Sequence, residues 1–450
     1  MKTNIVLTLL IYCLLALFQF LGVNSVLAQQ TGVLFNNVNI FDGENHTLHE
    51  GRNVLVVGNK IHTISRRSIS APDDVTVTRI DGGGRTLMPG LIDAHAHASL
   101  MSLPMVAAMT ADPAYVHIAN AVQAEKTLMR GFTTLRDASG PVFGLKRAID
   151  EGLIPGPRIY PAGAMISQTA GHGDFRMPHE VPRTAMSQLS HVETMGVSAI
   201  ADGVDEVMRR AREQLMLGAS HIKLAGGGGV SSVYDPLDAV QYTYEEIRAA
   251  VQAAENWGTY VMIHAYTPEA VQIAIRAGVK SIEHGQLLDE ETVIMMAEND
   301  VWWSLQPFFD DEFTNPKTGS SRVKQIMVSQ GTERAFELAK KHDVKVAWGT
   351  DMLFNPAGNK NQAAHLAKLT RWFTPAELLV MATSNNAQIL KLSGERNPYP
   401  GDLGVVKEGA YADLLLVQGN PLEDIDLIRD PDTNFVIIMK DGKIYKNSTQ

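Results

Sequence analysis

The spacing of apolar positions changes along this chain. From residue 91 onward, short apolar runs typical of buried strands alternate with longer segments whose apolar residues recur every three to four positions, as on one helix face. The eight strand-like runs are residues 91–97, 133–137, 158–162, 220–224, 260–264, 281–284, 301–306 and 344–348. The helix-like segments are residues 114–130, 204–217, 244–257, 268–277, 290–298, 332–341 and 375–392. Eight strands that alternate with helices predict an α/β fold, a (β/α)₈ TIM barrel.

Strand-like runs without intervening helices flank this region at both ends. They are residues 33–40, 52–57, 60–65 and 75–81 before it and residues 404–406, 412–417, 435–440 and 443–445 after it. Turn-forming pairs such as Asp441-Gly442 separate them. We therefore expect one composite β-sandwich built from residues 29–88 and 396–450, and a barrel formed by residues 89–395.

Several predicted helices carry clear start signals. Thr243 and Thr374 each lie three residues before a glutamate, which is the spacing of a capping box. Pro268 and Pro375 stand where the first helical residue is expected, a position that favours proline.

The first 28 residues differ from the rest of the chain. Lys2 is the only charged residue before Asp42, residues 5–21 are almost wholly apolar, and small residues lead up to Ala28. This pattern predicts a signal peptide over residues 1–28, cleaved after Ala28, and a secreted or periplasmic protein without a stable membrane anchor. An uncleaved anchor is the alternative, because the apolar run approaches the length needed to span a bilayer.

Composition limits the kinds of partner and of metal ligand. Hydrophobic residues make up 45% of the chain and charged residues 20%, and the formal net charge is −10 without a cluster of basic residues. This balance argues against nucleic acid as a partner. The only cysteine, Cys13, lies in the predicted signal peptide. The mature protein would then have neither disulfides nor thiolate ligands, so a metal must be held mainly by histidine and carboxylate.

Metal-binding side chains stand at the ends of several predicted barrel strands. His95 and His97 are two residues apart, so their imidazoles point the same way, about 6.6 Å apart along the strand. Active sites of such barrels lie at the carboxyl ends of the strands, where His264, His284 and Asp351 are expected to join them. Each residue alone has a structural alternative, for example Asp351 as a helix N-cap. Together they predict a metal site.

Lys223 occupies the equivalent place in the fourth predicted strand. A protonated lysine amine cannot bind a cation. A neutral amine that has captured CO₂ is a carbamate, whose two oxygens can bridge two metal ions. The alternative is a lysine that contacts substrate or neutral protein groups. His221 is expected to pack in the core, and the histidines without a partner pattern are expected to be structural or at the surface: His46, His49, His62, His117, His179, His191, His342 and His365.

The predicted site resembles that of the amidohydrolase superfamily, in the subtype whose two metal ions are bridged by a carboxylated lysine. The residues that carry this resemblance are His95, His97, Lys223, His264, His284 and Asp351. The segments M-P-G-L-I-D at 88–93 and G-A-Y-A-D-L at 409–414 are also similar to the family. The segments G-H-G-D at 171–174 and G-G-G-G-V at 226–230 are most similar to the imidazolonepropionase-related branch, which contains Xaa-Pro, Xaa-Arg and Xaa-Lys dipeptidases (prolidases) and ochratoxin-type amidases.

This resemblance implies a ligand set and a mechanism. His95, His97 and Asp351 would hold the first metal ion and His264 and His284 the second, while carboxylated Lys223 and a hydroxide would bridge them. Two divalent ions are implied, with Zn²⁺ as the default and Mn, Co or Fe left open. Asp351 would take the proton of the attacking water and pass it to the leaving nitrogen.

The resemblance also implies a substrate class and its contacts. The expected reaction is hydrolysis of a non-cyclic amide bond in a small molecule, a dipeptide or N-acyl amino acid with a free C-terminal carboxylate. Loop residues would contact it: His172 as oxyanion donor, Tyr234 at a carbonyl or carboxylate, and Arg176 at the carboxylate. Loop packing is the alternative for each. Relatives are often homo-oligomers, but the sequence shows no interface signature.

Three points stay open at this stage. A cyclic-amide hydrolase or a deaminase would use the same site, and a non-catalytic metal- or solute-binding protein would bind metal without hydrolysing amides. The loop between residues 306 and 329 fits either a pocket for a basic or aromatic side chain or a solvated lid. It contains Phe308, Phe309, Asp310, Asp311, Glu312 and Phe313.

Overall fold

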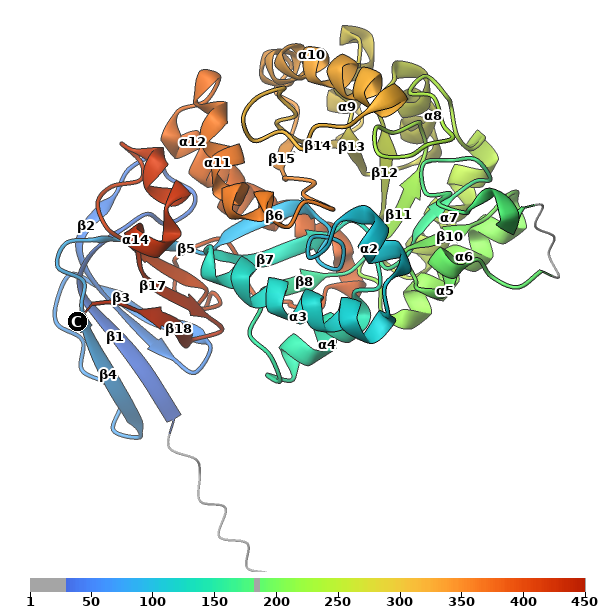
Figure 1. Cartoon of the computed structure of the whole chain (residues 1–450). Coiled ribbons are helices and arrows are strands. Elements are labelled where there is room, and N and C mark those ends of the chain that lie inside the picture. The colour runs from blue at the N-terminus through green and yellow to red at the C-terminus, as the bar shows by residue number, and fades with distance from the viewer. Residues whose placement is uncertain (1–29, 182–186, 450) are drawn as a thin grey trace, which may run out of the picture.

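The computed structural model describes residues 30–181 and 187–449. The chain forms a barrel of parallel strands surrounded by helices, beside a β-domain at the left of Figure 1 that contains the first and last strands. The predicted signal peptide, residues 1–28, lies outside the described residues. Within the described ranges, every helix is too short or too polar to cross a bilayer.

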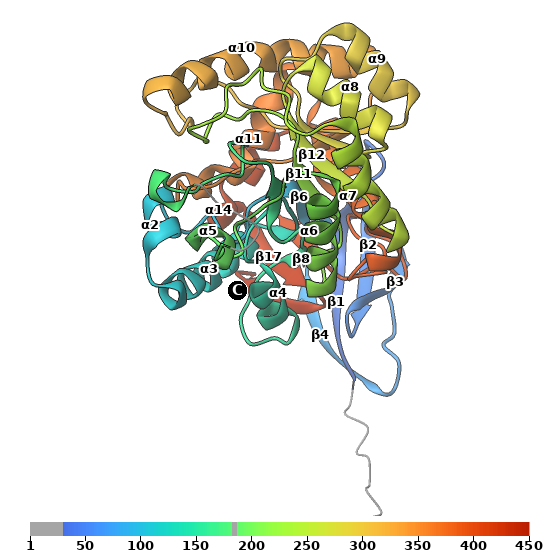
Figure 2. The same cartoon turned by 90° about the vertical axis from the view of Figure 1, so that its right-hand side faces the viewer.

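The barrel strands form two parallel sheets, which confirms the predicted architecture (Figures 1 and 2). The first consists of β6 (Leu91–Ala96), β7 (Phe132–Asp137) and β8 (Arg158–Tyr160). The second runs in the order β10 (Ser198–Ile200), β9 (Met165–Ser167), β11 (Ile222–Ala225), β12 (Val261–Ala265), β13 (Ser281–His284), β14 (Trp302–Leu305) and β15 (Val346–Trp348).

The third predicted strand, residues 158–162, is shorter than expected. Pro161, which has no N–H to donate, directly follows β8, and the chain resumes as β9 after Gly163. β8 pairs with β7, whereas β9 pairs with β11 and with the short edge strand β10, which the sequence did not predict.

A side chain joins the two edges of the barrel between β6 and β15. The Asn386 amide donates to the carbonyls of Ile92 and Trp348, at 2.7 and 2.8 Å, and its oxygen accepts from the Trp348 N–H at 3.0 Å. Gly349 lies so close to β6 that a Cβ there would come within 2.5 Å of the His95 backbone nitrogen. The barrel is therefore closed by one buried amide and by a close approach that only glycine permits.

Helices surround the barrel (Figure 2). The predicted bounds of α6, α8 and α9 are confirmed, as are the capping boxes at Thr243 and Thr374. α10 begins well before the predicted residue 332, and a π turn at Met381–Asn385 divides the last predicted helix. The helices are α2 (Met105–Thr110), α3 (Pro113–Met129), α4 (Phe143–Asp150), α5 (His191–Thr194), α6 (Val204–Leu217), α7 (Tyr244–Asn256), α8 (Pro268–Ala277), α9 (Glu290–Glu298), α10 (Gly319–Lys341), α11 (Gln362–Ala367), α12 (Pro375–Val380) and α13 (Asn386–Leu390).

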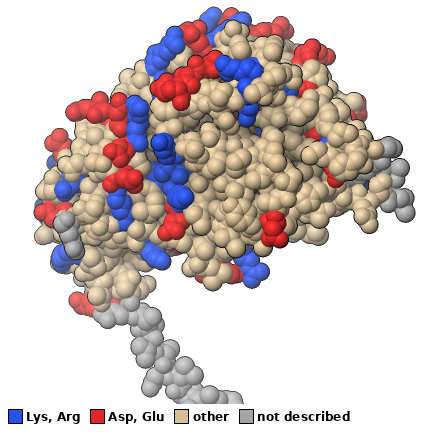
Figure 3. Space-filling view, in the orientation of Figure 1, with Lys and Arg blue, Asp and Glu red and all other residues tan. Residues whose placement is uncertain are grey.

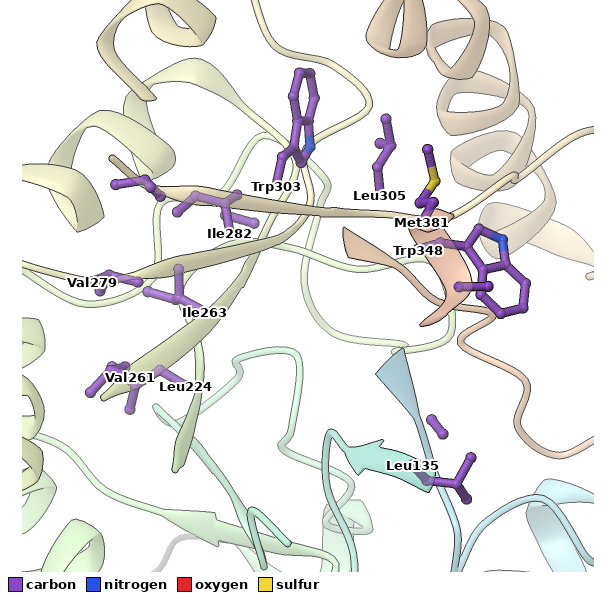
Figure 4. Packing of buried hydrophobic residues seen from close by; sticks show 14 of the residues in the cluster. Leu135, Leu224, Val261, Ile263, Val279, Ile282, Trp303, Leu305, Trp348 and Met381 are labelled. Atoms are coloured by element: carbon purple, nitrogen blue, oxygen red, sulfur yellow. The ribbon is translucent and has the colours of Figure 1, made fainter. Parts of the chain in front are cut away.

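The barrel core packs apolar strand residues against the helices. Ile263, Ile282, Trp303 and Trp348 are fully buried in one continuous cluster (Figure 4). Burial of such side chains contributes roughly 1.5–3 kcal/mol each. This packing holds the strand ends, and the polar residues on them, in fixed positions.

The β-domain combines both ends of the described chain, as predicted. β16 pairs antiparallel with β5. The Ile61 N–H donates to the Ala410 carbonyl, and the Ile61 carbonyl accepts from the Gly409 N–H, beside a shared apolar core. The predicted strand 404–406 is wrong, because Val406 makes one backbone bond to Asp42 but no ladder. The strands are β1 (Gln30–Ile40), β2 (His49–Val57), β3 (Lys60–Ser65), β4 (Val75–Asp81), β5 (Thr86–Pro89), β16 (Leu414–Val417), β17 (Phe435–Lys440) and β18 (Lys443–Asn447); α14 (Pro431–Asn434) precedes β17.

Ion pairs around the buried Arg158 side chain connect the β-domain to the barrel. The Arg158 guanidinium, on β8, contacts Asp413 at 2.9 Å and Asp441 at 2.6 Å, both in the β-domain. On the face shown in Figure 3, acidic and basic side chains are interspersed along the left and upper parts, and the middle is largely uncharged.

Candidate active site

The structure brings the six predicted metal-binding residues into one pocket at the carboxyl ends of the barrel strands. Four of them come from β6 and the strands β11 to β13, and His97 and Asp351 directly follow β6 and β15. Their convergence agrees with the expectation that the active site of a barrel lies at the carboxyl ends of its strands.

His95, His97 and Asp351 form the first group of ligands. The Asp351 carboxylate lies 2.9 Å from His97 Nε2 and 3.4 Å from His95 Nε2. One ligand atom from each of the three residues lies within 4.8 Å of the others, which is close enough for one metal ion. His95 Nε2 is buried and makes no hydrogen bond. An unpaired buried nitrogen is costly unless it binds a ligand, so this group fits a divalent ion.

Lys223, His264 and His284 form the second group. The His264 and His284 ring centroids are 4.5 Å apart, and His95 and His284 are 4.8 Å apart, so the two groups adjoin. Lys223 Nζ is fully buried and has no hydrogen-bond partner. Burial lowers the pKa of Lys223 to about 8, against the opposing charge of Glu283. Near neutral pH a fraction of this amine is therefore uncharged, as capture of CO₂ requires.

Buried polar residues fix the orientation of these histidines. Glu283 lies 2.6 Å from His95 Nδ1, and Gln306 Oε1 lies 2.7 Å from His284 Nδ1. A hydrogen bond at Nδ1 leaves Nε2 of the same ring available to coordinate a metal ion. Burial lowers the pKa values of His264 and His284 well below the usual range, which keeps both imidazoles neutral.

Glu283 is itself held by Arg136, which the sequence did not reveal as part of the site. Arg136 Nη2 lies 2.8 Å from both Glu283 oxygens, and both side chains are fully buried. The available signal was the presence of charged residues inside two strands that are otherwise apolar or weakly polar. The sequence does not show which residue such a charge pairs with, so it does not distinguish a metal ligand from a residue that supports one through an ion pair.

Two residues of the site have unusual backbone conformations. His284 has φ 78° and Asp351 has φ 53°, in the left-handed region that non-glycine residues rarely adopt. Such conformations persist where the surroundings enforce them, and they concentrate at functional sites.

Of the predicted substrate contacts, His172 lines the pocket. Its ring stacks on His264 at 3.9 Å, and Nδ1 lies 2.8 Å from Ser232 Oγ and 3.7 Å from an Asp235 oxygen. Tyr234 and Arg176 do not line the pocket. The Tyr234 hydroxyl donates to the Arg176 carbonyl at 2.8 Å, and Asp174 binds the Arg176 guanidinium on both oxygens. Arg176 thus has an internal ion-pair partner, and substrate contact by Arg176 or Tyr234 stays a prediction.

The expected position is confirmed for one of two other histidines and differs from the structure for the second. His221 is buried and stacks on Tyr260, in agreement with the expectation of core packing. His365 was expected to be structural or at the surface, yet it lines the pocket beside Phe313, 6.0 Å between ring centroids. Its position depends on α11, which the sequence did not predict.

The loop after β14 places its aromatic and acidic residues on different sides. Phe308, Phe309 and Phe313 line the pocket. Asp310 is paired with Arg322 at 2.8 Å and Asp311 with Lys368 at 2.5 Å, and neither lines the pocket. The aromatic residues of this loop therefore line the pocket and its acidic residues do not, while the side-chain specificity stays a prediction.

Comparisons with known proteins agree with this geometry. The Amidohydrolase family profile matches residues 86–446. The ochratoxinase of Aspergillus niger is 32% identical over 372 residues, which cover 80% of this chain and 75% of that protein. A solved prolidase complexed with N-methylphosphonate-L-proline is 32% identical with a TM-score of 0.83, over 92% of this chain and 100% of that one. A Xaa-Pro dipeptidase with bound methionine in its active site is 28% identical with a TM-score of 0.78, over the same shares.

These matches confirm the resemblance to amidohydrolases and to the branch that contains prolidases and ochratoxinase. The chain belongs to the amidohydrolase family and is an enzyme that hydrolyses carbon–nitrogen bonds.

Proposed function

We propose that this protein hydrolyses the amide bond of dipeptides or N-acyl amino acids that carry a free C-terminal carboxylate, with two divalent metal ions. The observation that carries the proposal is one pocket that gathers two groups of ligands, in which His95 Nε2 and Lys223 Nζ are buried without partners. The relatives support the substrate class, because one is an ochratoxinase and others are prolidases.

The donor set favours two sites bridged by a modified lysine. His95, His97 and Asp351 would hold one ion and His264 and His284 the other, with Zn²⁺ favoured by imidazole and carboxylate ligands. Carboxylation of Lys223 would turn a repelled cation into a bridging anion. When bound, the two ions would lower the pKa of water at the site and polarise the substrate carbonyl.

Asp351 is the group that moves the proton. Burial alone would raise its pKa, but the adjacent imidazoles of His95 and His97 hold the pKa of Asp351 well below its usual value. The carboxylate is therefore ionised and can accept a proton from the attacking water. It then returns that proton to the leaving nitrogen.

His172 would stabilise the charge that develops on the substrate carbonyl oxygen. Ser232 and Asp235 hold its Nδ1 side, and its ring lies against His264. With its Nδ1 side held in this way, His172 can present its Nε2–H toward the reacting carbonyl.

Export is a further part of the proposal. The charge and apolar pattern of residues 1–28 supports a secreted or periplasmic location. Exported protein should begin at Gln29 when its N-terminus is sequenced, and an intact N-terminus would contradict cleavage.

Metal removal tests the proposed chemistry. Purified protein should contain about two divalent ions per chain by elemental analysis, and chelation should abolish hydrolysis of Xaa-Pro dipeptides, other dipeptides and N-acyl amino acids. Zn²⁺ should restore it.

The same panel, extended with cyclic amides and amino-purines, separates the alternatives. Hydrolysis of cyclic amides or deamination alone would contradict the proposed substrate class. Metal uptake with no turnover of any compound would point to a binding protein.

A further inference from the structure

Lys317 is an unpaired cation in the wall of the active-site pocket. Among the described residues that line the pocket, Lys317 and Lys223 are the only lysines or arginines, and Asp351 is the only acidic residue. No described carboxylate forms an ion pair with Lys317. Burial lowers its pKa, and Asp351 is the one charged group that opposes this shift. The ammonium is thus partly removed from water without a protein partner, which favours an anionic ligand.

The backbone around Lys317 is held rigidly. Its N–H donates to Gln325 Oε1 at 3.0 Å, and the Gln325 amide donates to the Asn315 carbonyl at 3.0 Å. Arg322 also donates to Gln325 Oε1, at 2.8 Å, while it pairs with Asp310. These bonds fasten the loop to the start of α10, so Lys317 faces the pocket from a fixed position.

The walls beside Lys317 are apolar and aromatic. Phe308, Phe309 and Phe313 come from the same loop, and Val328 comes from α10. Phe309 stacks on Trp372, and the Lys368 ammonium lies 4.0 Å over the Phe313 ring, so both rings are fixed from behind. A pocket with this lining fits an apolar or aromatic side chain and offers a basic one no carboxylate besides Asp351.

We propose that Lys317 binds the C-terminal carboxylate of the substrate and that the phenylalanine wall accepts an apolar or aromatic side chain of the same residue. This inference rests on the proposed function and deepens it. The proposal gives Lys317 the carboxylate-binding role that the sequence suggested for Arg176. The Arg176 guanidinium is bound by Asp174.

The test compares acids with their amides. L-alanyl-L-phenylalanine and N-acetyl-L-phenylalanine are each assayed beside their C-terminal amides, and release of alanine or acetate reports the same bond in each pair. Lys317→Met should raise KM for the acids roughly 10- to 100-fold with a smaller change in kcat, because a hydrogen bond between charged groups is lost. KM for the amides should change less than about twofold.

Two variants serve as controls. Lys360→Met removes the same charge from an exposed lysine outside the pocket and should leave both acid and amide kinetics unchanged. Lys317→Arg keeps the charge and should retain most of the preference for acids over amides, which also covers the case in which Lys317→Met does not fold.

The outcomes separate this inference from the proposed function. Equal losses on acid and amide in Lys317→Met, or no loss, overturn the role of Lys317, as does loss of the preference in Lys317→Arg. If the wild-type enzyme hydrolyses other amides but neither phenylalanine acid, the assignment of the aromatic wall is overturned. If it hydrolyses no amide at all, the proposed function itself fails.

Discussion

At the scale of single residues, Asp351 combines the most functions. It contacts two histidines of the first ligand group, adopts a left-handed backbone conformation and is the only acid among the described residues that line the pocket. In the proposed mechanism, Asp351 would contribute both to metal binding and to proton transfer.

Replacement of Asp351 tests the proton-transfer role. Asp351→Asn keeps the shape of the side chain but cannot accept and return a proton, so kcat/KM should fall by roughly 10²- to 10⁴-fold. The thermal midpoint and steady-state kinetics check this outcome, and the midpoint should change little. Asp300→Asn, at an exposed ion pair with Lys345 outside the pocket, is the matched control and should stay within about twofold of wild type. An Asp351→Asn enzyme within tenfold of wild type would remove the assigned role.

The metal-binding residues could be found from the sequence because each ends an apolar run, and the carboxyl ends of barrel strands meet at one place. Lys317 and His365 could not be found in this way. They reach the pocket from a loop and from the short helix α11, where the apolar pattern does not indicate which side faces the pocket. Glu283 and Arg136 were visible as buried charges in strands, but their pairing depends on register across the barrel.

At the scale of elements, the junction between β6 and β15 depends on the π turn before α13. The turn at Met381–Asn385 ends just before Asn386, whose amide bonds both strands. The helical period predicted a continuous helix over residues 375–392, and a π turn of five residues is too short to have a distinct apolar period of its own. The split between β8 and β9 was foreseeable only from Pro161.

Asn386 is expected to be important for stability. Asn386→Ala leaves two buried carbonyls and one buried N–H without partners, so the free energy of unfolding should fall by about 3 kcal/mol or more. Denaturant unfolding measures the change. Asn299→Ala, which removes one exposed bond at the end of α9, should cost less than about 1 kcal/mol. Equal losses in the two variants would show that the barrel closes without this side chain.

At the scale of the whole molecule, the barrel and the β-domain share the ion cluster of Arg158, Asp413 and Asp441, in which Arg158 and Asp413 are buried. Asp413 binds two guanidinium nitrogens of Arg158 and accepts the Asp441 N–H at 2.7 Å. Because Arg158 is on a barrel strand, this contact connects the stability of the two parts.

Removal of Asp413 tests that connection. Asp413→Ala leaves a buried cation with one fewer partner, so the free energy of unfolding should fall by roughly 3–5 kcal/mol. Calorimetry should show one transition in the wild type, moved to lower temperature in the variant. Glu151→Ala, at an exposed ion pair with Arg147, should leave the transition unchanged. An unshifted Asp413→Ala transition would mean that the cluster does not join the two parts.

The pairing of β5 with β16 has a consequence for the order of folding. β5 ends at Pro89 and its partner begins at Leu414, so this edge of the sheet stays open until nearly the entire polypeptide has been synthesised. Contacts between such distant segments form slowly, because a long loop must close before they stabilise anything. For a chain proposed to be exported, the β-domain therefore cannot be completed before residues 414–417 are available to pair with β5.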